Sequence, residues 1–229
     1  IEYGADPGCD LDDRAQWVQA NPGRVQVEAI EAERRELSPE GFARERLNIW
    51  PTDRTEQIIP ADVWAGLVAE GPVQGTTPSA IAVDASPSRD IAIAACWIGD
   101  DDGVHVELLA TDHHDPLLAL QFVADIAGKR IPVVIDGASP AASMVPALNA
   151  QRVSVITTTG QDMARACGGF FDDVMAGMLS HDGHPALAEA VAGAKKRPIG
   201  AAGAWGWDRA DGSVFVAPLV AVTLARHGA

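Results

Sequence analysis

The chain has 229 residues, 47% hydrophobic and 21% charged, with a net charge of −15 at pH 7. This composition is typical of a globular protein with one large domain, or one domain and an appendage, and no apolar run is long enough to span a membrane. Three widely spaced cysteines argue against a disulfide framework and a zinc site, and the acidity argues against tight DNA binding through a strongly basic surface.

The N-terminal part of the chain is acidic and predicted to be helical. A short helix over 61–69 is expected next, and the stretch 71–79 is rich in Gly, Pro and Thr, which is typical of a linker. We therefore expect residues 1–75 to form a small helical segment that is separable from the domain formed by 76–229.

From residue 80 onward the chain alternates between apolar strands and helices. Strands are predicted at 80–85, 90–99, 103–111, 132–136 and 153–157. Helices are predicted at 116–127, from 139 onward, at 161–179, 185–192 and 218–226, with a hairpin at 203–216. This order predicts a mixed α/β sheet with helices on both faces, as in ribonuclease H-like folds, although several other α/β folds share it.

Two acids stand at matching positions in this pattern. Asp84 and Asp136 each end an apolar strand, and each is followed by small residues and a Ser-Pro pair. Parallel strands would bring them to one edge of the sheet, where open α/β sheets keep their sites. Two adjacent carboxylates repel each other unless a cation lies between them, and Mg²⁺ and Mn²⁺ prefer such oxygen ligands. The alternative is that both acids only begin loops or cap helices.

Four blocks of the C-terminal part resemble, in the same order, the nuclease domain of tailed-phage terminase large subunits of the actinobacterial-phage type. They are AVDASPSRDIAIAACW (82–97), VVIDGASPAASMVPAL (133–148), 155–187 and APLVAVTLA (217–225). The resemblance implies a ribonuclease H-like fold and a nuclease that cuts concatemeric double-stranded viral DNA with two divalent ions, Mg²⁺ or Mn²⁺. It also implies that Asp84 and Asp136 are metal ligands on the first and middle strands.

The resemblance extends to the partners of such a domain. Residues 11–50 resemble the stretch that joins the terminase ATPase domain to the nuclease domain. No phosphate-binding GxxxxGK[ST] loop occurs in the sequence, so we expect the segment 1–75 to follow an ATPase domain that this chain does not contain. The implied partners are double-stranded DNA, that ATPase domain, the portal and the small terminase subunit, with a ring oligomer as one arrangement of the motor. The implied location is the host cytoplasm, without membrane contact.

The third metal ligand departs from the family pattern. The family usually supplies an acid near the start of the last helix, but residues 214–218 contain no carboxylate. Asp172 lies in the FFDDVMAG stretch shared with the family and is the candidate for this role, although a helical Asp more often faces solvent. Asp173 is about 100° further round the helix, so at most one of the two can point directly inward.

Two further polar groups are candidates for contacts with DNA. Lys195, Lys196 and Arg197 form the basic cluster of the C-terminal half and could hold a DNA backbone, although a solvated charge run is the ordinary interpretation. The run 157–159 consists of three threonines after a predicted strand. They could contact phosphate, but helix capping is the ordinary explanation.

The leading functional hypothesis is a metal-dependent endonuclease within a packaging motor. The first alternative is a DNA-gripping or motor-docking module that is catalytically incomplete because a third acid is missing. The second is a phosphotransferase of the actin or sugar-kinase type, which also carries an acid on its first strand. Such enzymes use glycine-rich phosphate turns, which the segment VDASPSRD (83–90) lacks.

Overall fold

The computed structural model describes residues 4–6, 8–23, 25–49, 57–99, 103–113, 115–201, 203–210, 212 and 214–229. The chain divides into two compact units, Ile1–Thr55 and Glu56–Ala229. None of the helices within these described ranges combines the length and the apolar character needed to cross a bilayer.

The first unit is helical, as predicted. It contains α1 (Arg14–Ala20), α2 (Val27–Glu36) and α3 (Pro39–Arg46). Its small core is built from Trp17, Ile30, Phe42 and Leu47, with the rings of Trp17 and Phe42 in edge contact at 5.7 Å between centroids. Each helix contributes at least one of these side chains, so the core joins all three.

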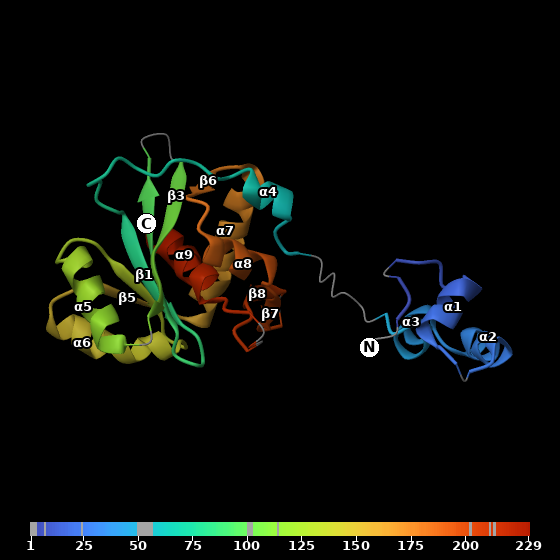
Figure 1. The fold of residues 1–229 in the computed structure, drawn as a ribbon. Helices are drawn as coiled ribbons and strands as arrows, with labels where there is room; N and C mark the ends of the chain where they lie inside the picture. Colours follow the sequence, from blue (N-terminus) through green and yellow to red (C-terminus); the bar gives the residue numbers. More distant parts are fainter. Residues whose placement is uncertain are drawn as a thin grey trace. The chain divides into compact units, whose positions relative to one another are not determined.

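The second unit is built on a six-stranded mixed sheet (Figure 1). Its strands lie in the order β5-β4-β1-β2-β3-β6, and β2 is antiparallel to both of its neighbours, β1 and β3. Strand β4 is parallel to β1, β5 is parallel to β4, and β6 is parallel to β3. The bounds are β1 Ala80–Ala85, β2 Ile91–Ile98, β3 Val104–His113, β4 Val133–Asp136, β5 Val155–Thr158 and β6 Leu179–His181.

Helices cover both faces of this sheet (Figure 1). One face packs against α5 (Pro116–Ala127), the 3₁₀ helix η1 (Pro140–Met144) and α6 (Val145–Ala150). The other face packs against α4 (Ala61–Ala65), α7 (Gly160–Ala176), α8 (Pro185–Ala192) and α9 (Ala217–Gly228). Every residue from Ala217 to Ala225 is buried, so α9 is surrounded by protein and not amphipathic. The predicted mixed sheet with helices on both faces is confirmed.

Two predicted boundaries differ from the structure, and in both places glycines adopt positive φ angles. The long helix α7 ends at Ala176 because Gly177 takes the left-handed conformation (φ 70°) that commonly ends a helix, and β6 follows it. The hairpin expected at 203–216 instead pairs β7 (Lys196–Ile199) with β8 (Ala204–Trp207). Gly200 and Gly203 supply the positive φ angles of its turn.

The unit boundary also lies earlier than the expected separation at residue 75. Ile59 and Trp64, in or beside α4, are buried in the core that includes α9. The Trp64 ring stacks on that of His181 at 4.0 Å between centroids, and Nε2 of His181 donates to the carbonyl of Trp64 at 3.0 Å. Removing residues 1–75 would therefore take a tryptophan out of the core, whereas the compact unit begins at Glu56.

Candidate metal centre

Asp84 and Asp136 lie side by side at the ends of β1 and β4. The parallel register pairs Val83 with Ile135, so the next residue of each strand falls in the same row. Side chains alternate between the faces of a sheet, and both acids point to the face covered by α7 and α9. Asp84 is fully buried and Asp136 is 3% exposed. The structure thus brings together the two acids that the sequence singles out.

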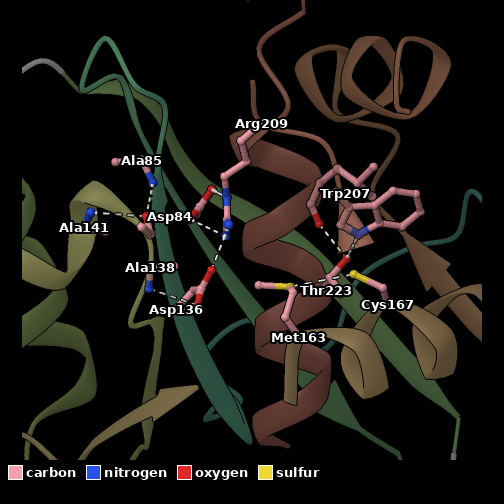
Figure 2. A network of polar contacts seen from close by, with 12 residues as sticks. Asp84, Ala85, Asp136, Ala138, Ala141, Met163, Cys167, Trp207, Arg209 and Thr223 are labelled. Carbon is pink, nitrogen blue, oxygen red and sulfur yellow. Dashed lines mark hydrogen bonds and ion pairs between the residues drawn. The ribbon is translucent and has the colours of Figure 1, made fainter. Parts of the chain in front are cut away.

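Arg209 lies between the two carboxylates and binds both of them (Figure 2). Its Nε and Nη2 donate to the two oxygens of Asp84, at 3.1 and 3.0 Å, and its Nη1 donates to Oδ2 of Asp136 at 2.8 Å. The planar guanidinium makes a two-pronged bond to one carboxylate and a single bond to the other. A positive charge therefore already occupies the space between the two acids.

The segment that carries Arg209 is anchored to the domain by the two residues that precede it. Trp207, the last residue of β8, is 2% exposed, and its indole Nε1 donates to Oγ1 of Thr223 on α9 at 2.9 Å (Figure 2). The next residue, Asp208, donates its backbone N–H to the carbonyl of Lys195 at 2.8 Å. Oδ1 of Asp208 accepts from the N–H of Ala210, which tightens the turn around Arg209.

The Gly-Ala-Ser-Pro turn after β4 orients both carboxylates. The hydroxyl of Ser139 accepts from the N–H groups of Ala85 and Ala141, at 3.3 and 3.2 Å, and donates to Asp84. The N–H of Ala138 donates to Oδ1 of Asp136 at 3.2 Å. These bonds use the full capacity of the serine hydroxyl and fix the rotamers of the two acids before any ligand arrives.

Burial and charge act against each other in this group. Burial raises the pKa of Asp84 above its ordinary value, and the neighbouring charge of Asp136 adds to this, while Arg209 and Ser139 oppose it. For Arg209, burial alone would lower the pKa, but the charges of Asp84 and Asp136 outweigh it and the pKa is raised. The guanidinium therefore stays charged.

A cavity of about 380 Å³ opens beside Asp84 and Arg209. Ser86, Ser88 and Asp90 from the turn between β1 and β2 line one part of it, and the first turn of α9 lines another. Asp84 is therefore buried but borders a space that a ligand can enter.

Asp172 does not lie with the two strand-end acids. Its neighbour Asp173 accepts from Nε of Arg226, in the last turn of α9, at 2.7 Å. That turn lies at the start of β1, where Gly228 packs against Ala80, whereas the first turn of α9 lines the cavity at the other end of the strand. Asp172 is exposed at the far end of α7, and this placement corrects the expectation that it closes the site. In the described part of the chain, no three acid, His or Cys side chains are grouped to hold a metal.

The basic cluster lies on the hairpin that leads to Arg209. Lys196 begins β7 and pairs in register with Trp207, and its Nζ lies over the rings of Trp205 and Phe171, at 4.4 and 5.1 Å from their centroids. Lys196 and Arg197 are exposed. The hairpin thus pairs the cluster with Trp207, two residues before the arginine that binds both acids.

Arg209 is the residue of this candidate site that the sequence interpretation missed. It falls inside a segment predicted to be a hairpin turn, where a lone arginine is ordinary. One signal was present, because two acids expected to meet at a sheet edge need a counter-charge. Arg209 is the sole basic residue between 198 and 225.

The side chains present fit a hard divalent cation. The carboxylates of Asp84 and Asp136 lie in one row across two neighbouring strands. On the next strand, the buried hydroxyl of Thr158 has no hydrogen-bond partner among the described residues. Carboxylate and hydroxyl oxygens are the ligand types that Mg²⁺ and Mn²⁺ take, in contrast to the sulfur and imidazole ligands of zinc sites.

By sequence, the chain matches no defined protein family and no curated protein. By structure, it is similar to the large terminase of bacteriophage HK97, with a TM-score of 0.59 and 18% identity over 99% of this chain and 56% of that one. It is also similar to the nuclease domain of the large terminase subunit of bacterial virus Sf6, with a TM-score of 0.52 and 12% identity over 75% of this chain and 98% of that one. The fold is that of the large terminase nuclease domains.

The terminase fold confirms the predicted ribonuclease H-like architecture. A mutant of the Sf6 nuclease domain with manganese has a similar score, 0.51, at 12% identity over 75% of this chain and 98% of that one. The present chain spans about half the length of the HK97 large terminase, 56%.

Proposed function

We propose that this chain is the divalent-metal-dependent endonuclease part of a phage DNA-packaging terminase, cutting concatemeric double-stranded DNA by phosphodiester hydrolysis. The observation that carries the proposal is the meeting of Asp84 and Asp136 in one buried row around a cationic group, beside an open cavity. Two neighbouring buried carboxylates need a counter-charge, which Arg209 supplies here, and the same oxygens are the ligands that a hard divalent cation prefers. The terminase nuclease fold supports this function class.

Asp84 and Asp136 are the residues that would hold Mg²⁺ or Mn²⁺. When bound, a pair of such ions activates a water molecule and stabilises the leaving oxygen of the phosphodiester. The residues of the chain prepare the acids for this role: Ser139 and Ala138 orient the carboxylates, and Arg209 balances their charge. The guanidinium must give up at least part of its contact with the acids when a divalent ion enters, because both compete for the same oxygens.

The proposed setting is a packaging motor in the host cytoplasm. There the domain would act on DNA delivered by a terminase ATPase domain, with the portal and the small terminase subunit, in an assembly that could be a ring oligomer. The net charge of −15 fits this setting, because a domain with little basic surface relies on other parts of an assembly to hold DNA.

The proposal is tested by incubating the purified chain with supercoiled plasmid in Mn²⁺, in Mg²⁺ and in EDTA. We expect nicked and linear DNA in the presence of either ion and intact plasmid in EDTA. The competing function is a DNA-gripping or docking module, which is favoured by the grouping of only two acids in the described residues. DNA binding without cleavage under every divalent ion would support that module and overturn the nuclease proposal.

The basic cluster is expected to contact the DNA backbone. Replacing Lys195, Lys196 and Arg197 with alanine should weaken DNA binding equally for all sequences, because phosphate contacts position DNA without reading it. The slope of log K against log salt should fall by roughly one unit for each phosphate that is no longer neutralised. The matched control replaces Lys129 and Arg130, which are exposed after α5 on the opposite face of the sheet. Equal slopes in the two variants would contradict a role for the cluster in binding the DNA backbone.

A further inference from the structure

Thr158 continues the row of polar side chains that begins with Asp84 and Asp136. It is the last residue of β5 and pairs in parallel register with Asp136, so the two side chains point to the same face of the sheet. Asp84, Asp136 and Thr158 lie on three consecutive strands, β1, β4 and β5. Neighbouring strands are about 4.8 Å apart, so the three side chains form one continuous row. Thr158 is only 4% exposed.

The hydroxyl of Thr158 is not explained by local structure. Oγ1 has no hydrogen-bond partner among the described residues. The next residue, Thr159, is explained by capping, because its side chain accepts from the N–H of Asp162 and forms a capping box at the start of α7. A buried hydroxyl without a partner carries an unrelieved desolvation cost, and a valine would fill the same shape without it.

The position of this hydroxyl in the row indicates a role beside a bound cation. Asp136 is the middle member of the row, with Asp84 on one side and Thr158 on the other. A cation held by Asp136 therefore meets a carboxylate on one flank and a neutral hydroxyl on the other. A hydroxyl oxygen can ligate a hard cation or bind a water of its shell, and it adds no further negative charge to a buried group that already contains two carboxylates.

We propose that Thr158 is the third polar arm of the cation site, binding the divalent ion at Asp136 directly or through one of its water molecules. The inference rests on the proposed function and names a role for Thr158 in it. With this third arm supplied by β5, the site needs no ligand from Asp172, which is exposed near the C-terminal end of α7.

The test compares Thr158→Val with Thr158→Ser and with the control Thr157→Val. Thr157 is the preceding residue of β5, is exposed, and points to the opposite face of the sheet. Mn²⁺ affinity is measured by titration calorimetry, and thermal stability is measured in EDTA and in Mn²⁺. These readouts do not depend on DNA cleavage.

We expect Thr158→Val to bind Mn²⁺ about 10- to 100-fold more weakly, the loss typical of groups that support a metal site. Its melting temperature in EDTA should equal or exceed that of the wild type, because the unpaired hydroxyl is gone. Thr158→Ser should bind Mn²⁺ almost as well as the wild type, and Thr157→Val should be indistinguishable from it.

Two outcomes overturn the inference alone. One is wild-type Mn²⁺ affinity in Thr158→Val, and the other is a lower melting temperature of that variant in EDTA, which would show that the hydroxyl has a structural partner. Failure of the wild type itself to bind Mn²⁺ would overturn the proposed function together with the inference. The wild-type titration therefore distinguishes the two failures.

Discussion

Replacing Asp84 or Asp136 with asparagine is expected to lower metal-dependent DNA cleavage on the order of 10⁴-fold, a loss typical of removing one member of a catalytic group. Asparagine keeps the size of the side chain but removes the charge that attracts a divalent cation. The two variants should differ in stability. Asp136→Asn leaves the two-pronged bond between Arg209 and Asp84 intact, whereas Asp84→Asn puts an NH₂ donor in place of one accepting oxygen and breaks that two-pronged bond.

The control for this pair of variants is Asp172→Asn. Asp172 is exposed near the C-terminal end of α7, away from the two strand-end acids, so its replacement should leave both cleavage and stability unchanged. Cleavage rates are measured on plasmid in Mn²⁺, and melting temperatures in EDTA report folding. Full cleavage by Asp84→Asn or Asp136→Asn would remove these residues from the site, and a large loss in Asp172→Asn would return that residue to it.

The pairing of Asp84 with Asp136 was accessible from the sequence because it depends on local patterns. Each acid ends a short apolar run, and parallel strands bring such ends to the same edge. The position of Asp172 was not accessible, because helical periodicity fixes the face of a helix on which a residue lies but not which end of the sheet that turn approaches. Only the packing of α7 against α9, with Asp173 bound to Arg226, decides this.

Arg209 shows a second limit of sequence interpretation. Its contacts span 125 residues to Asp84 and 73 residues to Asp136, and no local pattern encodes such contacts. Because the hairpin is formed by β7 and β8, Arg209 lies just after it and not in its turn. It follows Trp207, whose indole binds Thr223 and anchors the chain to α9. Thr158 is intermediate: the sequence placed it after a strand, but only the register with Asp136 separates it from its capping neighbour Thr159.

Replacing Arg209 with methionine is expected to destabilise the metal-free protein strongly. The guanidinium side chain is 15% exposed and is bound to two carboxylates that are almost completely buried. Removing one partner of a buried ion pair costs about 3–5 kcal/mol, because the remaining charge is left without compensation. For a domain of this size that corresponds to a fall of roughly 6–20 °C in melting temperature.

Mn²⁺ should reverse most of this loss, and this reversal separates a site for cations from a purely structural ion pair. In the wild type a divalent ion must compete with Arg209 for the oxygens of Asp84 and Asp136, whereas in Arg209→Met it meets two uncompensated carboxylates. The rise in melting temperature on adding Mn²⁺ should therefore be larger in the variant than in the wild type. Arg209→Lys is the matched control, since it keeps the charge but loses the planar fork. Its rise in melting temperature on adding Mn²⁺ should lie between those of the wild type and Arg209→Met.

A metal-free Arg209→Met variant as stable as the wild type would show that the guanidinium does not bridge the acids in solution. A destabilised variant that Mn²⁺ fails to rescue would show that the two acids need a positive charge for folding alone and do not bind the ion.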